Sequence, residues 1–150
     1  MTKPRILIVG AGPTGLTAAL DLTRFGFEPT LVDRKSGPSG LSRAVGILPA
    51  TMHLWHPSGV AAQIVDQAVK VSGVRIHKGA REILHVPMPA SNDPYHRMFG
   101  LPQNQTEHLL RKALEGQGNT VHFDTELTHI NQTETSVTAT LNGDKQRFDY

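Results

Sequence analysis

The chain has 150 residues and a formal net charge of +2 at pH 7, and its 38% hydrophobic and 19% charged residues fit one globular domain and exclude a wholly disordered chain. The basic residues are scattered with few aromatic residues between them, so we expect no nucleic-acid partner. Cysteine is absent, which excludes disulfides, a CxxC redox pair and thiolate metal sites and favours a cytoplasmic location.

The first 33 residues have the pattern of a strand, a helix and a second strand. Residues 5–9 form a continuously apolar run of the kind that is buried on both faces of a parallel sheet. Apolar residues then recur at helical spacing over 16–23, Gly26 ends that helix, and residues 29–33 form the second strand. Because glycines interrupt this N-terminal apolar stretch, it is neither a signal peptide nor a membrane span, and no membrane partner is expected.

The middle of the chain predicts short helices followed by strands. After a turn-rich loop, residues 47–55 and 59–67 are typical of helices, with Pro49 in the first turn of the former. Residues 69–77 and 82–86 favour strands that leave the parallel sheet. We therefore expect an excursion from the main domain at about 68–103.

The last third of the chain predicts a return to the sheet and then a meander. Residues 105–114 form an amphipathic pattern with Leu109, Leu110, Ala113 and Leu114 on the buried face. Residues 120–123 can supply a third parallel strand. From Leu127 the pattern alternates as in antiparallel strands, and Asn142-Gly143 is a strong hairpin signal. The fold class is therefore α/β, a βαβ parallel sheet with an antiparallel meander.

A glycine-rich motif, GAGPTG, lies between the first strand and its helix and supplies the candidate binding residues Gly10, Gly12, Pro13, Thr14 and Gly15. In such a GxGxxG motif the first glycine allows the tight turn, the second lets a pyrophosphate approach, and the third lets helix and strand pack closely. Asp33 lies 18 residues after Gly15 at the end of the second strand, where a carboxylate can accept hydrogen bonds from a ribose. The pattern predicts a dinucleotide site, and Asp33 disfavours a 2′-phosphate, which leaves FAD or NAD.

Three segments carry a family resemblance. The extended spacing GxGxxGxxxAxxLxxxG, which starts at Gly10 and is closed by Asp33-Arg34, resembles the N-terminal fingerprint of FAD-binding proteins. The segments SRAVGI over 42–47 and LPQNQTE over 101–107 are similar to signatures of flavin-dependent aromatic hydroxylases related to para-hydroxybenzoate hydroxylase. Ala50, where many relatives carry Arg, and the His56-Pro57-Ser58 segment depart from the family pattern.

The resemblance implies a Rossmann-like FAD-binding domain and a monooxygenase function. FAD would be reduced by NAD(P)H and, with O2, would hydroxylate a small aromatic substrate. In this family the residues matching Arg43 and Gln103 contact FAD, and the one matching Arg34 lies by the adenosine part. Arg111, one turn beyond the glutamine motif, is a further candidate for a cofactor contact. The resemblance also implies that residues 1–150 are the N-terminal part of an FAD-binding domain, incomplete at the C-terminus and inactive alone.

Several alternatives stay open. The chain could belong to another flavoprotein of the same fold, such as a halogenase or a reductase, or be a nucleotide-binding module with no turnover of its own. Disulfide reductases are excluded because their paired cysteines would fall in this range. We interpret His53 and His56 as a surface or packed pair rather than metal ligands, since no third ligand is suitably spaced. No catalytic residue, specific substrate or oligomeric state follows from the sequence.

Overall fold

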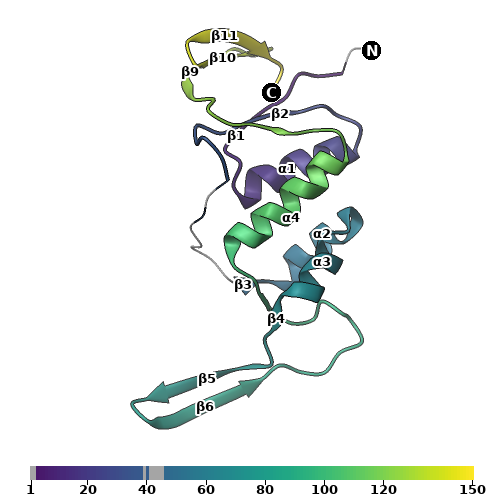
Figure 1. Cartoon of the computed structure of the whole chain (residues 1–150), viewed down its shortest axis with the longest axis vertical. Helices are drawn as coiled ribbons and strands as arrows, with labels where there is room; N and C mark the ends of the chain where they lie inside the picture. The colour runs from purple at the N-terminus through teal and green to yellow at the C-terminus, as the bar shows by residue number, and fades with distance from the viewer. Residues whose placement is uncertain (1–2, 39, 41–45) are drawn as a thin grey trace. The chain divides into compact units, whose positions relative to one another are not determined.

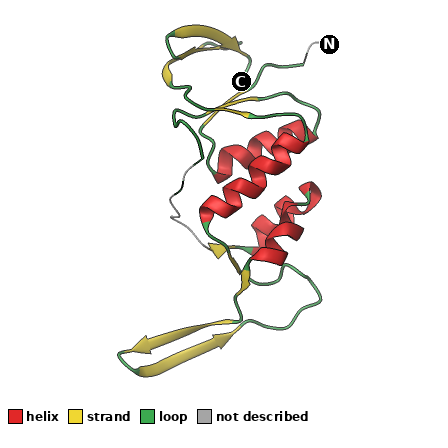
Figure 2. Cartoon of the chain, viewed as in Figure 1, coloured by secondary structure: helices red, strands yellow, loops and turns green. Residues whose placement is uncertain are grey.

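The computed structural model describes residues 3–38, 40 and 46–150. The chain divides into two compact units, one of Met1–Ser42 with Gln103–Tyr150 and the other of Arg43–Pro102. The second unit begins earlier than the excursion expected at about 68–103. Both units contain helices and strands, as Figure 2 shows, so the fold is mixed α/β.

The first unit is built on a strand–helix–strand segment. β1 (Leu7–Val9) and β2 (Thr30–Val32) pair in parallel, and α1 (Pro13–Arg24) connects them. Gly26 follows the end of α1 at a φ of 87°, a left-handed value that suits glycine at a helix end. β8 (Val121–His122) pairs in parallel with β2, which confirms the third expected parallel strand. The order of the strands in this sheet is β1-β2-β8.

α4 (Gln103–Gly116) lies beside α1 in the first unit (Figure 1). It contains the helix expected over 105–114, with one correction, because Ala113 is only partly buried. α1 follows β1 and α4 precedes β8, so both helices run against the direction of the parallel strands. Their N-termini therefore lie at the end of the unit where β1 and β2 finish. No helix among the described residues combines the length and hydropathy that a membrane crossing requires.

The antiparallel meander follows β8. β9 (Leu127–Gln132), β10 (Val137–Leu141) and β11 (Asp144–Phe148) pair in the order β11-β10-β9, which confirms the expected topology. Asn142 and Gly143 form the turn between β10 and β11 with φ values of 49° and 92°. Two successive positive values are what a type I′ hairpin turn requires, so the hairpin signal in the sequence is also confirmed.

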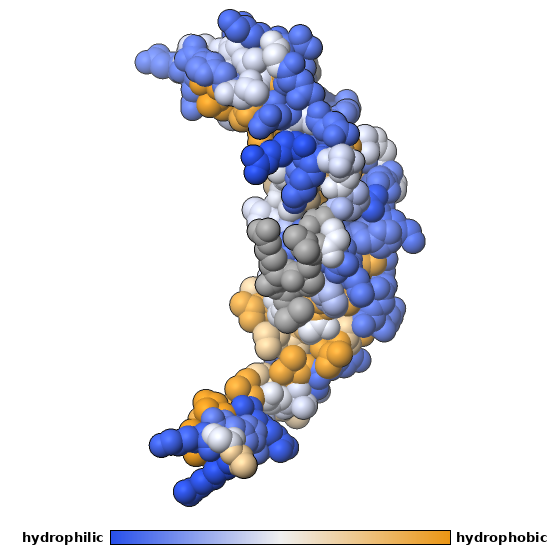
Figure 3. Space-filling model, turned by 60° about the vertical axis from the view of Figure 1, so that its left-hand side comes forward, coloured by the Kyte–Doolittle hydropathy of each residue, from blue (hydrophilic) through white to orange (hydrophobic). Residues whose placement is uncertain are grey.

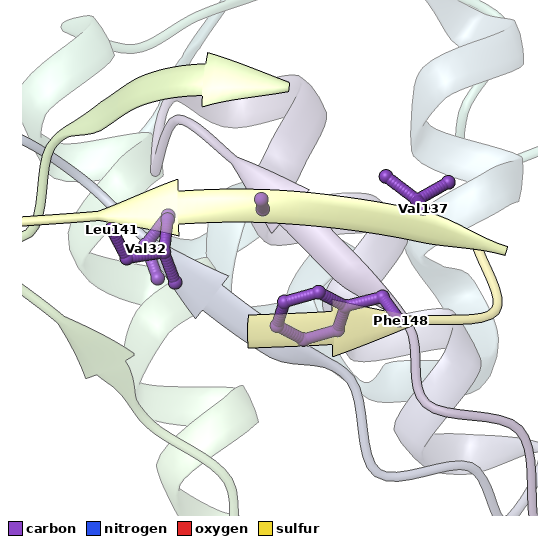
Figure 4. Close-up of a cluster of buried hydrophobic side chains, with 5 residues drawn as sticks. Val32, Val137, Leu141 and Phe148 are labelled. Carbon is purple, nitrogen blue, oxygen red and sulfur yellow. The ribbon is translucent and has the colours of Figure 1, made fainter. Parts of the chain in front are cut away.

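The core of the first unit has two sides, one on each face of the parallel sheet. On one face a buried cluster joins β2 to the meander (Figure 4), and its members are Val32, Val137, Ala139, Leu141 and Phe148. Leu31, the neighbour of Val32, points to the opposite face because side chains alternate along a strand. That face packs against α1. The packing fixes the ends of β1 and β2 between the helices and the meander.

The second unit carries two small sheets and two helices with a 3₁₀ turn between them. In chain order its elements are β3 (Gly46–Ile47), α2 (Pro49–Trp55), η1 (His56–Ser58), α3 (Val60–Gln67), β4 (Val69–Lys70), β5 (Gly73–Lys78), β6 (Arg81–Pro87) and β7 (Phe99–Gly100). β7 pairs antiparallel with both β3 and β4, and β5 pairs with β6 in a hairpin. Apolar side chains on both hairpin strands are 44–56% exposed, and Figure 3 shows them in orange at the lower end of the view.

Two expectations for the second unit were wrong in detail. The helix expected over 47–55 begins at Pro49, because the residue before a proline favours an extended backbone, and Leu48 has φ −81° and ψ 156°. Ile47 therefore belongs to β3. The strand expected over 69–77 is split into β4 and β5, which pair with different partners.

Candidate functional site

The glycine loop, residues 10–15, joins β1 to α1 in a tight turn. Gly10 has a φ of 102°, and its N–H donates to the carbonyl oxygen of Val32 over 2.7 Å. A Cβ added to Gly15 would lie 1.9 Å from the carbonyl oxygen of Gly10, so only glycine allows the close approach of α1 to the loop. A Cβ added to Gly12 would meet no atom within 4 Å. The first and third glycines thus serve the fold, and the second leaves open space beside the backbone.

Asp33 at the end of β2 holds the glycine loop. Its Oδ2 accepts a hydrogen bond from the N–H of Ala11 over 2.8 Å, and its Oδ1 accepts one from the N–H of Lys35 over 2.9 Å. The residue is only 7% exposed. A carboxylate offers about four acceptor sites, so roughly two remain for other donors.

The same contacts determine the protonation of Asp33. Burial by itself would raise the pKa of its carboxyl group. Hydrogen bonds from the backbone N–H groups of Lys35 and Ala11, together with the positive charges of Lys35 and Arg34, outweigh burial and lower the pKa below its ordinary value of 3.8. At neutral pH Asp33 is therefore an ionised, buried acceptor at the carboxyl end of the sheet.

The start of α1 offers hydrogen-bond donors to an anion. Within the part of the chain that the structure describes, no side chain caps this helix at Gly12, and its first turn contains no acidic residue. Pro13 has no N–H, and the N–H groups of Thr14 and Gly15 belong to the turn in which a helix leaves its donors without a backbone partner. The helix dipole adds a partial positive charge at this point, so the loop suits a phosphate group.

A cavity of about 380 Å³ opens beside Asp33, within the range of small-molecule sites. Its lining comes from the ends of β1 and β2 and from the segment that enters β9: Val9, Gly10, Asp33, Arg34, Lys35, Thr125, Glu126 and Leu127. The expectation that residues 5–9 are buried on both faces was wrong: Val9 is 52% exposed, Arg5 is also exposed, and the three residues between them are only partly buried. Val9 is the last residue of β1 and lines the cavity, which leaves about half of its side chain exposed.

The segment between β8 and β9 closes one side of this cavity through backbone contacts. The N–H of Thr125 donates to the carbonyl oxygen of Asp33 over 3.0 Å, and the N–H of Asp124 donates to that of Lys35 over 2.8 Å. Asp124 has a φ of 52°, so the chain turns sharply there. Sequence reasoning missed Thr125 and Glu126 as lining residues, because backbone contacts carry no residue-type signal.

The structure brings some of the expected site residues together and leaves others apart. Asp33 and Arg34 line one cavity with Gly10, and the rest of the glycine loop leads from it into α1. Gln103 is the first residue of α4, the helix beside α1. Arg111 lies two turns further along α4. Arg43 lies outside the described residues, as do its neighbours Ser42 and Ala44.

The two expected side chains of α4 have partners on the same helix. The Nε2 of Gln103 donates to the Oε1 of Glu107 over 2.7 Å. The guanidinium of Arg111 donates to the Oε1 of Glu115 over 2.9 Å and contacts the Nδ1 of His108 at 3.3 Å. Sequence reasoning missed Glu107, although the spacing of four residues from Gln103 was a signal that could have revealed it.

The histidine pair of the second unit fastens a loop to α2, which contains His53, and to η1, which begins at His56. Nε2 of His53 lies 2.9 Å from Oδ2 of Asp93, and Nδ1 of His56 lies 2.8 Å from the hydroxyl of Tyr95. Asp93 also accepts a hydrogen bond from the N–H of Tyr95 over 2.9 Å. Across the described residues no group of three His, Asp or Glu side chains is arranged to hold a metal ion.

The sequence was compared with protein families and with curated proteins. A family model described as "FAD binding domain" matches residues 3–149. The chain is 34% identical over 126 residues to 6-methylpretetramide 4-monooxygenase of Streptomyces rimosus, a match that covers 83% of this chain and 23% of that protein. It is 30% identical over 140 residues to pentachlorophenol 4-monooxygenase of Sphingobium chlorophenolicum, covering 91% of this chain and 26% of that protein.

The fold has close counterparts among solved structures. The crystal structure of p-nitrophenol 4-monooxygenase PnpA from Pseudomonas putida DLL-E4 superposes with a TM-score of 0.89 at 24% sequence identity. This match covers 99% of the present chain and 39% of that structure, and at this identity it bears on the fold alone. The chain thus spans about a quarter of the length of the two curated relatives.

Proposed function

Because this chain belongs to the family of FAD-binding domains, we propose that it is the FAD-binding part of a flavin-dependent monooxygenase that hydroxylates an aromatic substrate. The observation that carries the proposal is the joint geometry of the glycine loop and Asp33. An uncapped helix start, open space beside Gly12 and a buried ionised acceptor lie within one segment. A dinucleotide requires such a set, since it carries a pyrophosphate and a ribose diol.

The residues present fit FAD. The N–H groups of Thr14 and Gly15 would hold the pyrophosphate, and the open side of Gly12 would let it approach. The free acceptor sites of Asp33 would take the ribose hydroxyls in the adjoining cavity, beside Arg34. Gln103 and Arg111 on α4, with Arg43, complete the proposed cofactor residues. In this arrangement the βαβ segment acts as a Rossmann-like half-site.

When bound, FAD supplies the oxidation–reduction chemistry, which no amino-acid side chain of this chain can provide. The role of the chain's own residues is to bind and orient the cofactor. Asp33 stays ionised at neutral pH, so it accepts hydroxyl donors and repels a 2′-phosphate. The proposed reductant is NAD(P)H. The proposed substrate is a small aromatic compound, a choice that is supported by similarity to a protein named pentachlorophenol 4-monooxygenase.

The test uses the purified full-length protein. We expect it to be yellow, to absorb in the flavin bands, and to release FAD on denaturation. Oxidation of NADH or NADPH should accelerate when phenolic ligands are added one at a time, and product analysis should find the added oxygen. A folded, colourless protein that binds NAD in place of FAD would overturn the proposal. A yellow protein that oxidises NAD(P)H and hydroxylates no aromatic compound would support FAD as the cofactor and contradict the proposed hydroxylation.

A further inference from the structure

Asn142, in the turn between β10 and β11, makes three hydrogen bonds to the segment that leads into β9. Its side-chain Oδ1 accepts from the N–H of Glu126 over 2.8 Å, and its Nδ2 donates to the carbonyl oxygen of Asp124 over 2.7 Å. Its backbone N–H donates to the carbonyl oxygen of Glu126 over 2.9 Å. The turn therefore holds the backbone on both sides of Thr125.

The position of this segment is not determined by regular strand pairing. The pairing of β9 with β10 begins at Leu127, opposite Leu141, and its register is irregular at that end. Asp124 has a φ of 52°, which is uncommon for a residue other than glycine. An asparagine amide offers one donor and one acceptor, as a peptide group does, so the Asn142 side chain continues the hydrogen bonding beyond the last strand pair.

The segment held by Asn142 forms a wall of the cavity beside Asp33. The N–H of Thr125 donates to the carbonyl oxygen of Asp33, and both Thr125 and Glu126 line the cavity. Asn142 is exposed and is not among the described residues that line it. Any influence of Asn142 on a ligand in this cavity must therefore pass through residues 124–126.

We propose that Asn142 is a positioning residue for the cofactor cavity, because its side chain holds residues 124–126 where they form the wall. This inference rests on the proposed FAD-binding function. If the ribose binds Asp33, the groups attached to that ribose must share the cavity with Thr125 and Glu126. Asparagine also suits a type I′ turn, which by itself would explain the residue type. The two side-chain contacts with the wall are additional to what the turn requires.

Asn142→Gly separates the role in the turn from the role in the wall. The φ of 49° at this position suits glycine, so the turn is kept while both side-chain hydrogen bonds are lost. Because Asn142 is exposed, the change leaves no hole in the core. A typical hydrogen bond shifts an equilibrium by about 2- to 10-fold. Apparent affinity falls with the fraction of molecules that have the wall in place, so we expect FAD binding to be about 3- to 10-fold weaker.

Asn142→Asp tests the donor alone. Aspartate has nearly the same shape and keeps an acceptor for the N–H of Glu126, but it places a second oxygen where Nδ2 now lies 2.7 Å from the carbonyl oxygen of Asp124. Two acceptors repel at that distance, so the loss of FAD affinity should be at least as large as in the glycine variant. Titrations in low and high salt separate this local effect from direct repulsion between the new charge and FAD, which salt screens.

The test uses the full-length protein and two readouts. FAD affinity is measured by titrating apoprotein into FAD and following the quenching of flavin fluorescence. Hydrogen–deuterium exchange of the apoprotein reports on residues 123–127 without any ligand. Thr133→Ala is the matched control, because the Thr133 Oγ1 accepts from the N–H of Ser136 over 3.1 Å and so ties the turn at the other end of β9 and β10. It should change neither FAD affinity nor exchange over 123–127.

The outcomes separate a role in the wall from a general role in stability. The inference is supported if both Asn142 variants weaken FAD binding and speed exchange over 123–127, while Thr133→Ala does neither. It is overturned if Asn142→Gly binds FAD as the parent does, if binding weakens without faster exchange, or if Thr133→Ala weakens binding equally; in each case the proposed function stands. If Asn142→Asp does not fold, the glycine variant decides. If the unaltered protein binds no FAD, the proposed function fails, and this inference fails with it.

Discussion

Replacing Gly12 and Gly15 with alanine, one at a time, should separate the folding role of the glycine loop from its ligand-binding role. The Cβ of Gly15→Ala would lie 1.9 Å from the carbonyl oxygen of Gly10, where Cβ atoms keep at least 3.0 Å from other heavy atoms. That oxygen belongs to the backbone and cannot rotate away, so β1 and α1 must separate. Overpacking of this kind costs about 1–3 kcal/mol or more, and we expect the loss of stability to reach the top of that range.

Gly12→Ala should behave in the opposite way. Gly12 has φ −78° and ψ −177°, an extended conformation that alanine adopts freely, and its added Cβ would meet no atom within 4 Å. A stability gain of about 0.4–1 kcal/mol is expected, because alanine restricts the unfolded chain. The same methyl group would occupy the space through which the pyrophosphate approaches. If the steric clash of this methyl group with the pyrophosphate costs about 1–3 kcal/mol of binding free energy, FAD affinity falls roughly 10- to 100-fold.

Two measurements decide between these effects: urea unfolding of the apoprotein followed by circular dichroism, and FAD titration of the folded protein. Gly116→Ala is the matched control, since a Cβ there also meets open space and the residue ends α4 away from the loop. It should change neither FAD affinity nor the loop. Gly12→Ala protein with unchanged FAD affinity would refute the assignment of the pyrophosphate to this loop. Gly15→Ala protein as stable as the parent would refute the close approach of Gly10.

Three further predictions concern single side chains. Asp33→Ala should weaken FAD binding by roughly 1–3 kcal/mol, about one to two decades in affinity by titration. The folded state lowers the pKa of the Asp33 carboxyl group, so the ionised group stabilises the fold. This stabilisation should be complete above the ordinary pKa of 3.8 and be lost as the pH falls through the lower pKa of the folded state, which urea unfolding at several pH values would reveal. Phe148→Ala should destabilise the first unit by about 3–5 kcal/mol in urea, since the ring is 2% exposed within the meander core. Arg111→Ala should weaken FAD binding only slightly in the same titration, because the guanidinium is already paired with the Oε1 of Glu115 over 2.9 Å.

The elements that the sequence could predict are those whose signal is local. The βαβ segment can be predicted from an apolar run, a glycine motif, a helix with helical spacing of apolar residues, and a second apolar run. The turn at Asn142-Gly143 follows from residue types that tolerate positive φ. In both cases the physical cause lies within a few residues of the element, so no knowledge of tertiary contacts is needed.

The small sheet of the second unit shows where such reasoning ends. β3, β4 and β7 have two residues each, which is too short for an alternating pattern to appear. Their pairing joins segments that lie far apart in the sequence, with Phe99 opposite both Ile47 and Lys70. Tertiary packing, and not local residue type, makes these segments strands, and Phe99 is accordingly buried, with only 1% of its surface exposed. Propensity alone therefore placed Ile47 in a helix.

The candidate site also combines features that the sequence predicts with features that depend on tertiary contacts. Glycine spacing and an acidic residue at a strand end pointed to Asp33 as a ribose acceptor, and that role remains a prediction. Its hydrogen bonds to the N–H groups of Ala11 and Lys35 could not be inferred, because any residue except proline at those positions would supply the same donor. Likewise, the walls of the cavity at Thr125 and Glu126 depend on how the chain turns after β8.

The contacts of Asp33 join two features that the sequence presents separately. The positive φ of Gly10 turns the chain so that the N–H of Ala11 meets the Asp33 carboxylate, and the carboxylate in turn holds the loop at the end of β2. The acidic residue is therefore part of the loop's folding as well as a proposed ligand group. Removing it should loosen the pyrophosphate site and the ribose site together, whereas Asp33→Asn keeps one acceptor oxygen for one of the two backbone donors. FAD affinity of the asparagine variant should accordingly lie between those of the parent and the alanine variant, and equal losses in both would assign the whole effect to the negative charge.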